Sequence, residues 1–584
     1  MASSKTQKAC FYSDIRDVLK NHRALNVANN NVYDTLLRTL SDCSEVELVV
    51  KIVKDLEHCI SLLNLDYKPL VGLIMKLNWL DNGPELIKAF QSFMLNLVSA
   101  QIFYLKPCLT TLVAMFAQET TKGPDDDGGK RKEDFSHIHS LLKSISQIVP
   151  MTGSVLVQIL DNRFPYVTKS VSCFENYTQN ILLITTYMPV QRLDILEIVV
   201  KNMLKLDVRS SRHDISSALS SIMAGTDHVD LMDTTFDMEE VSQVASESSH
   251  EADSRLSAAL PQAASLDAML ELTFHYVKDQ CYTDAKLDWD RTKRLYRELL
   301  SVFNKLILPT HASCHVQYIM FYVCSFREVL ADGFIDYLWK KVTDPTAESV
   351  YRQSAACYIG SFITRSKYLS VKTAKQVVEL MVKWIHSYLD RTCDQGAHAD
   401  LAHHAPFYSV CQSVFYIFCF KHMDFMGMKG YRWAESLNLQ RIVTSKLNPL
   451  RVCMPIIVST FASAARLHQL AFCDTVIERN NRYHLPVAAS TYSTEGSRQT
   501  QLQSYFPFDP YLLPRSCSHI RPLYKEFHGS LPGEDDDAVD EDEDDFLPSD
   551  EEDMNLAACD ISLSVGKSPS NVLQYGMSPG FKNG

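Results

Sequence analysis

Glycine and proline are scarce in this sequence. The 584 residues include only 19 glycines and 22 prolines. Because β-sandwiches and β-barrels need many tight turns, this composition argues against both architectures. Familiar catalytic motifs are missing as well: there is no GxxxxGK[ST] phosphate loop, no GxSxG elbow and no HExxH helix. We therefore predict that the chain is not an enzyme and that it uses no cofactor.

Long apolar segments are also lacking. The stretches 405–420 and 452–465 are shorter than the roughly 20 residues that a membrane-spanning helix needs. The N-terminal sequence MASSKTQKACFYSDIRD has no apolar core of signal-peptide length. The 16 cysteines are scattered through helical runs without a CxxC pair, which predicts reduced thiols in the cytosol or nucleus. We expect a soluble protein without a membrane partner.

Amphipathic helices account for most of the sequence. In the segment 46–60, apolar residues recur at steps of three and four, and segments 84–100 and 135–149 repeat this spacing. Such a pattern lines one face of an α-helix. Prolines stand between these segments, where they suit the first turn of a helix. We predict an all-α, HEAT-like helical-repeat solenoid with no sheet of consequence, and a compact multi-helix bundle is the alternative.

Charge is distributed unevenly along the chain. The segment 534–553 contains 14 acidic residues and the segment 213–254 contains 10, with no lysine or arginine in either. Without these acidic residues the formal charge changes from −13 to +11, so the remainder is basic. A basic body with acidic appendages indicates anionic partners, although the appendages could simply aid solubility.

These changes in composition predict the domain organisation. Segments rich in serine and acidic residues bury too little apolar surface to order themselves. The expected parts are an N-terminal segment (1–30), an N-terminal helical-repeat half (31–208), a disordered acidic and serine-rich insertion (209–262), a C-terminal helical-repeat half (263–528) and an acidic, Ser/Pro-bearing disordered tail (529–584).

Only one cluster approaches the composition of a metal site. His311, Cys314 and His315 carry zinc-ligand types, but a single short cluster lacks the second pair that a structural zinc site needs. Thr310 just before them is a plausible N-cap. We therefore predict no metal site.

Basic residues between positions 340 and 375 form a candidate interaction surface. Such a surface could contact nucleic acid or an acidic protein, and an ordinary solvated helix face is the alternative. The residues are Lys340, Lys341, Arg352, Arg365, Lys367, Lys372 and Lys375.

Two groups of serines are candidates for regulation. Ser136, Ser140 and Ser144 recur every four residues, which places them on one helix face as a candidate partner-contact stripe. Phosphates there would turn a contact with an acidic partner repulsive. Candidate phosphorylation sites in the tail are Ser549, which precedes acidic residues, and Ser568 and Ser578, which each precede proline.

Several long strings in this sequence are distinctive. They include LPTHASCHVQYIMFYVCSF, LWKKVTDP, APFYSVCQSVFY, VIERNNR, YFPFDP and DEDEDDFL. In content, order and spacing they resemble the RNA polymerase I-specific transcription initiation factor family, also called transcription initiation factor IA. The segment 377–382, VVELMV, departs from the leucine-rich contact motif expected in that family.

The resemblance implies a HEAT-repeat protein of the nucleus and nucleolus. It implies binding to RNA polymerase I near the stalk, bridging to the promoter selectivity factor at ribosomal RNA genes, and regulation by kinases and phosphatases. Direct contact with DNA stays open. The alternative is another HEAT-type nuclear adaptor, such as a transport receptor.

Overall fold

A computed structural model describes most of the chain. The described residues are 15–23, 27–42, 46–118, 128–224, 259–311, 313–393, 400–427, 430–483, 502 and 506–526. They fall into two compact units, the first with residues up to 320 together with Leu512–His519, and the second with residues from 321 onward except that segment. The expected boundary lay in the segment 209–262. It falls later because α15 (Pro261–Cys281) packs on α10 (Val171–Tyr187) and α11 (Arg192–Asp207).

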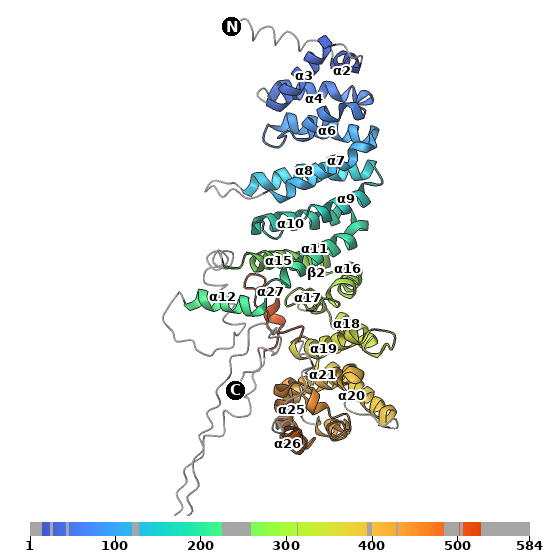
Figure 1. The fold of residues 1–584 in the computed structure, drawn as a ribbon, viewed down its shortest axis with the longest axis vertical. Coiled ribbons are helices and arrows are strands. Elements are labelled where there is room, and N and C mark those ends of the chain that lie inside the picture. Colours follow the sequence, from blue (N-terminus) through green and yellow to red (C-terminus); the bar gives the residue numbers. More distant parts are fainter. Residues whose placement is uncertain are drawn as a thin grey trace, which may run out of the picture. The chain divides into compact units, whose positions relative to one another are not determined.

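The first unit is a stack of helix pairs in two layers (Figure 1). Within each layer, a helix packs on the next helix of the same layer, which is the arrangement of a helical-repeat solenoid. One layer holds α4 (Val46–Glu57), α6 (Pro84–Ala100), α8 (Gly128–Ile148), α10 and α15. The other holds α7 (Leu105–Ala114), α9 (Thr152–Asn162), α11 and α16 (Trp289–Val302). The remaining helices of the unit are α2 (Ile15–Arg23), α3 (Val27–Asp42), α5 (Lys68–Met75) and α12 (Arg212–Ala224).

Short helical turns link these layers. They are the 3-10 turns η2 (Ile60–Leu62), η3 (Leu65–Tyr67), η4 (Ile102–Tyr104), η5 (Met115–Ala117) and η6 (Pro189–Gln191), and the π-helical turn η7 (Phe303–Ile307). Pro84 and Pro189 begin their elements, as the sequence predicted, because a first-turn residue needs no backbone N–H donor.

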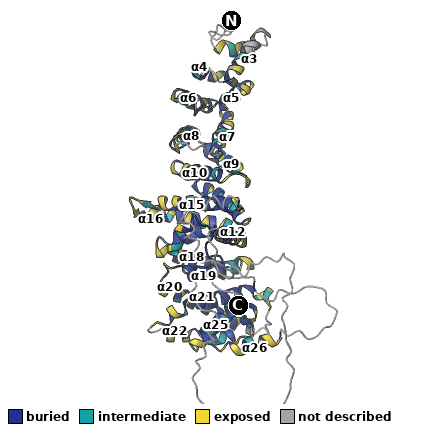
Figure 2. Ribbon diagram, turned by 90° about the vertical axis from the view of Figure 1, so that its left-hand side faces the viewer, coloured by how far each residue is buried: buried dark blue, intermediate teal, exposed yellow. Residues whose placement is uncertain are grey.

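The buried faces follow the periodicity of the sequence. In α6, Leu86, Phe90, Phe93 and Leu97 are all buried, and Figure 2 shows buried residues concentrated where neighbouring helices meet. Among the described residues the strands are β1 (Tyr282–Thr283) and β2 (Lys286–Leu287), a short antiparallel hairpin that pairs Tyr282 with Leu287. The all-α prediction is therefore confirmed.

The helix α12 corrects one expectation. It lies inside the segment 209–262, which the composition predicted to be disordered. Ser211 caps its start by accepting a hydrogen bond from the backbone N–H of Asp214 at 3.1 Å, and Ile215 and Leu219 are buried at a four-residue spacing. These local signals outweigh the polar composition. Residues 225–258 and 527–584 lie outside the described residues.

The second unit is built around α21 (Leu401–Phe425), which is buried along most of its length. It packs against α19 (Ser349–Arg365), α20 (Val371–Cys393) and α25 (Pro455–Leu467). The other helices are α18 (Glu328–Thr343), α22 (Gly430–Ser436), α23 (Leu439–Val443), α24 (Pro449–Val452), α26 (Asp474–Tyr483) and the turn η8 (Arg521–Leu523). Two short helices, α17 (Tyr318–Cys324) and α27 (Cys517–Ile520), have residues in both units.

A glycine allows the tightest contact in this unit. A Cβ built on Gly360 of α19 would lie 2.8 Å from Cβ and 3.1 Å from Cα of Ser413 in α21. The Ser413 hydroxyl donates to the carbonyl of Ala356 at 2.8 Å across the same contact. Close approach of the two helices therefore depends on the missing side chain.

Two further findings concern the chain as described. No helix in the described ranges combines the length and apolarity that a membrane crossing requires. Twelve cysteines of those ranges are free and buried, and burial raises the pKa of the Cys108 and Cys357 thiols to about 12.

Candidate interaction surfaces

The serine stripe lies on α8. Its apolar positions Ile138, Leu142 and Ile145 are buried, whereas Ser136 and Ser140 are exposed and Ser144 is half-buried. The Ser144 hydroxyl donates to the backbone carbonyl of Ser140 at 3.0 Å. The structure therefore presents two of the three serines fully to solvent and the third at the edge of the same face.

A buried histidine fixes the orientation of α8. One ring nitrogen of His139 lies 2.9 Å from the Tyr187 hydroxyl, and the other lies 3.0 Å from the side-chain oxygen of Asn180. Both partners belong to α10. Burial lowers the pKa of His139, so the neutral ring is favoured. These contacts set which face of α8 points outward, and so they position the serine stripe.

The basic residues of the sequence prediction do not share one environment. Lys340 is exposed at the end of α18 and pairs with Asp336 at 2.7 Å. The Lys341 amine lies 5.9 Å from the ring centre of Tyr337. Arg352 Nε donates to the carbonyl of Val342 at 2.8 Å, which caps the last turn of the same helix. These three residues therefore gather where α18 and α19 meet.

Arg365 is not part of an exposed surface, contrary to the sequence prediction. Its side chain is buried, with the guanidinium carbon 4.5 Å from the ring centre of Phe420 and 5.2 Å from that of Tyr524. A planar guanidinium stacks well on aromatic faces, so arginine can serve as a core residue where lysine would not. The charge pattern along the sequence could not reveal this stacking.

The other lysines lie on or beside α20. Lys372 is exposed, and the Lys375 amine lies over the Trp433 ring at 4.9 Å. Lys367 precedes the helix and lines a pocket of about 530 Å³. In the segment 377–382, only Glu379 and Leu380 are exposed, so most of this segment belongs to the core.

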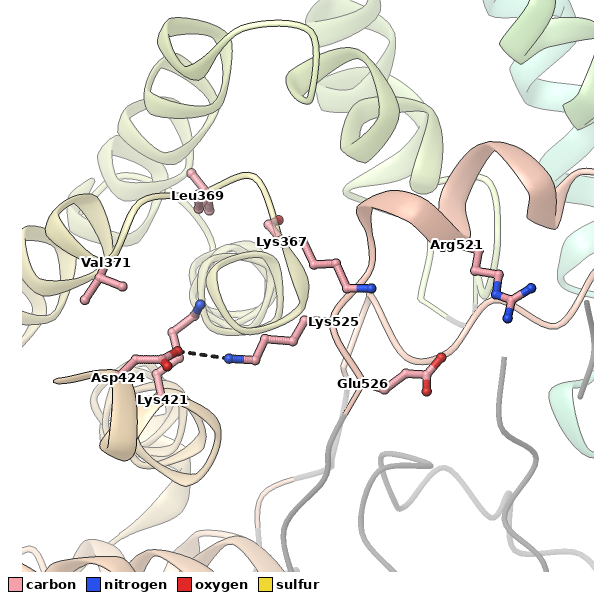
Figure 3. A pocket seen from close by; sticks show the side chains of 9 residues that line it. Lys367, Leu369, Val371, Lys421, Asp424, Arg521, Lys525 and Glu526 are labelled. Atoms are coloured by element: carbon pink, nitrogen blue, oxygen red, sulfur yellow. Dashed lines mark hydrogen bonds and ion pairs between the residues drawn. The ribbon is translucent and has the colours of Figure 1, made fainter. Parts of the chain in front are cut away.

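The pocket beside Lys367 brings together residues far apart in the sequence. It is lined by Ser366, Lys367, Leu369, Val371, Lys421, Asp424, Arg521, Lys525 and Glu526. Figure 3 shows Lys421 and Lys525 beside Asp424, with the Lys367 and Arg521 side chains on the other side of the pocket. The Lys525 amine donates to Asp424 at 2.9 Å. Sequence reasoning missed Lys421, Arg521 and Lys525, because no local pattern links them.

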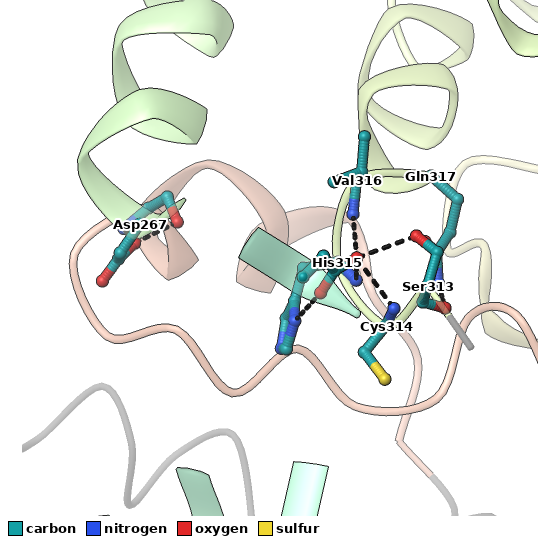
Figure 4. Close-up of polar contacts among 8 residues, drawn as sticks. Asp267, Ser313, Cys314, His315, Val316 and Gln317 are labelled. Atoms are coloured by element: carbon teal, nitrogen blue, oxygen red, sulfur yellow. Dashed lines mark hydrogen bonds and ion pairs between the residues drawn. The ribbon is translucent and has the colours of Figure 1, made fainter. Parts of the chain in front are cut away.

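Cys314 and His315, two of the three residues of the His311–Cys314–His315 cluster, take part in a buried polar network. The carboxylate of Asp207, at the end of α11, accepts five hydrogen bonds from residues 313–316. Figure 4 shows these donors converging on one point. Within the described ranges, no group of three or more His, Cys, Asp or Glu side chains is arranged to hold a metal ion.

A second buried aspartate holds the segment Leu512–His519. The Asp267 carboxylate, on α15, accepts backbone N–H bonds from Arg515 and Ser516, each at 2.8 Å. The Arg515 guanidinium in turn pairs with Glu175 of α10 and Glu271 of α15. A segment more than two hundred positions later in the chain is thereby fixed to the first unit.

The paired helix layers define the class: a HEAT-like helical-repeat protein, a scaffold that presents extended surfaces. Within this class, the family model described as RNA polymerase I specific transcription initiation factor RRN3 matches residues 4–531. The chain belongs to this family.

Individual relatives agree with the family match. The RNA polymerase I-specific transcription initiation factor RRN3 of Mus musculus is 37% identical over 566 residues, covering 92% of this chain and 85% of the mouse protein. The rrn3 factor of Schizosaccharomyces pombe is 27% identical over 509 residues, covering 83% of this chain and 80% of the yeast protein. These relatives are named as transcription initiation factors, not as enzymes.

A solved structure shares the fold. The crystal structure of RNA polymerase I transcription initiation factor Rrn3 matches with a TM-score of 0.65, covering 88% of this chain and 97% of that one. At 21% sequence identity, the match bears on the fold alone.

Proposed function

We propose that this chain is an initiation factor that binds RNA polymerase I and recruits it to the promoters of ribosomal RNA genes. The observation that carries the proposal is the family match over residues 4–531. The relatives' names link them to initiation by this polymerase. A helical-repeat scaffold suits the role, because it joins partners by surface contact and needs no catalytic group.

In this proposal the chain is an adaptor with at least two partners. One surface contacts the polymerase in its stalk region, and another contacts the promoter selectivity factor. Such work places the protein in the nucleus and in the nucleolus. Direct contact with DNA is not required by the proposal, although exposed Lys340 and Lys372 leave room for it.

Phosphorylation of the serine stripe is the proposed switch. Ser136 and Ser140 are exposed on a helix whose orientation is fixed by His139, so a kinase and a partner meet the same rigid face. Each phosphate adds about −1.5 to −2 charges at neutral pH. Two or three such groups on adjacent turns would repel an acidic partner surface. The tail serines Ser549, Ser568 and Ser578 lie outside the described residues and stay candidate sites.

The test combines purification with charge substitution. Tagged protein isolated from nuclei should recover RNA polymerase I subunits. Replacing Ser136, Ser140 and Ser144 by aspartate should reduce that recovery by about tenfold, corresponding to roughly 1.4 kcal/mol of added repulsion. The matching alanine variant should bind as the wild type does, because the small hydroxyls are replaced without adding charge.

A second triple variant controls for total charge. Ser99, Ser154 and Ser170 are exposed elsewhere in the first unit, and their replacement by aspartate adds the same charge without altering the stripe. Equal loss of binding in both aspartate variants would argue against a specific contact. Recovery of a small GTPase and transport cargo without polymerase would instead support the transport-receptor alternative.

A further inference from the structure

The pocket of the second unit contains more positive than negative charge. It forms where the loop after α19, the end of α21 and the chain after η8 meet (Figure 3). Its charged lining consists of four basic residues and two carboxylates: Lys367, Lys421, Arg521 and Lys525 against Asp424 and Glu526. The formal excess is therefore two positive charges within a volume of about 530 Å³.

Lys421 is the unusual member of this set. Its side chain is only 4% exposed, yet no hydrogen bond or ion pair joins its amine to any residue in the described part of the chain. The neighbouring carboxylate, Asp424, already accepts from Lys525. Burial lowers the pKa of Lys421 to about 8; the Lys525 charge acts in the same direction, and the Asp424 carboxylate acts against them. An ammonium that is largely removed from water and has no protein acceptor is destabilised, and an anion that enters the pocket can supply oxygen atoms to it.

We propose that this pocket binds the phosphate group of a phosphorylated protein segment, with the Lys421 amine as its innermost donor. A phosphomonoester carries close to two negative charges at neutral pH and three acceptor oxygens, which matches the excess charge and the several amine donors. Leu369 and Val371 on the same wall offer apolar surface against which a peptide backbone or side chain can pack.

Two competing ligands fit less well. A carboxylate side chain supplies one charge, which leaves part of the excess unbalanced. A nucleic acid presents an extended row of singly charged phosphodiesters, and proteins meet it with basic stripes. The pocket instead encloses its four basic residues in one volume, together with two carboxylates that would repel a continuous anionic backbone.

The test uses the full-length chain and a fluorescent, otherwise neutral peptide with a single phosphoserine. Anisotropy should show binding that is at least about tenfold tighter than that of the unphosphorylated peptide, because charge-assisted hydrogen bonds are made only by the phosphate. Inorganic phosphate should compete, but only at higher concentration. Binding of inorganic phosphate as tight as that of the phosphopeptide would overturn the peptide assignment.

Lys421→Met is the decisive variant. It should weaken phosphopeptide binding by about tenfold or more. It should not lower the melting temperature, because methionine fills a similar volume without a desolvated charge. Lys372→Met is the matched control: it removes an exposed lysine next to Val371, and binding should change by less than about twofold.

The remaining outcomes also decide the question. Equal binding of the phosphopeptide by the wild type and by Lys421→Met overturns the proposal. The proposal is also overturned if the phosphopeptide does not bind and a DNA duplex binds in a way that depends on Lys421. If Lys421→Met fails to fold, acylation of the lysine amines in the wild type is the alternative measurement. Bound phosphopeptide is expected to slow the acylation of Lys421 but not that of Lys372. Absence of that protection would refute the assignment.

Discussion

Replacing Asp207 by alanine removes the acceptor of five hydrogen bonds from one stretch of chain. Oδ2 accepts from the Ser313 hydroxyl at 2.8 Å and from the backbone N–H groups of Cys314, His315 and Val316 at 2.9, 2.9 and 3.2 Å, and Oδ1 lies 3.0 Å from His315 Nδ1. Asp207 and His315 are both buried, so water cannot replace the lost acceptor. Buried donors left without partners make the substitution costly.

The magnitude follows from comparable buried networks. Deleting a buried carboxylate that several donors surround is comparable to breaking a buried ion pair, which costs about 3–5 kcal/mol. We therefore expect Asp207→Ala to lower the free energy of unfolding of the first unit by about that amount. Asp207→Asn keeps the volume and one acceptor oxygen, so its cost should be about half, on the order of 2 kcal/mol.

The pH dependence supplies an independent check. Burial alone would raise the pKa of Asp207, but the hydrogen bonds from His315 and Ser313 and the attraction of the imidazole outweigh it, and the pKa falls below 3.8. A carboxyl whose pKa is lower in the folded state stabilises the fold above its unfolded pKa and loses that contribution as the pH falls. The stability difference between wild type and Asp207→Asn should therefore be constant above about pH 5 and shrink below pH 4.

The assay is urea unfolding monitored by circular dichroism, with hydrogen exchange of peptides spanning 313–320. Both should respond to Asp207→Ala, and exchange should increase first at residues 313–317. Asp194→Ala, an exposed residue in the first turn of α11, is the control and should cost less than about 1 kcal/mol. A cost below about 1 kcal/mol for Asp207→Ala, with unchanged exchange, would show that the network does not hold this segment.

Three further substitutions test other contacts. Gly360→Ala should destabilise the second unit by about 1–3 kcal/mol in thermal unfolding, because its Cβ meets the backbone of Ser413. Gly72→Ala, with open space around the new methyl, should stabilise the first unit by about 0.5–1 kcal/mol. A stabilising Gly360→Ala together with a destabilising Gly72→Ala would contradict the packing argument. Arg515→Ala should speed hydrogen exchange in residues 512–519, because the ion pairs to Glu175 and Glu271 are lost. Unchanged exchange would mean that Asp267 alone holds the segment.

The fold was predictable because its signals are local. Buried positions of α6 and α8 follow three- and four-residue spacings that are visible in the sequence. The same spacing placed Ser136 and Ser140 on the solvent side of α8. Where a local signal was overlooked, at Ser211 and Ile215, the prediction of disorder was wrong for α12.

Sites formed by residues that are far apart in the sequence could not be predicted, because no local spacing links those residues. Asp207 and His315 are 108 positions apart, and Lys367 and Lys525 lie further apart still. Each residue taken alone is an ordinary helix-end or loop residue. Arg365 shows the same limit, because its position in a run of basic residues suggested exposure while its aromatic partners, Phe420 and Tyr524, come from other segments.

The serine stripe depends on local sequence and the pocket on contacts between distant residues, so the two proposed binding surfaces should depend differently on folding. The serine stripe lies on one helix and is oriented by two contacts of His139, so it should persist whenever α8 and α10 pack together. The pocket around Lys421 exists only when the loop after α19, the end of α21 and the chain after η8 come together. Its affinity for phosphate is therefore coupled to folding of the second unit, because a ligand that binds only the assembled pocket stabilises that assembly. Phosphopeptide binding should thus raise the melting temperature of the second unit, while phosphorylation of the stripe on the first unit should leave it unchanged.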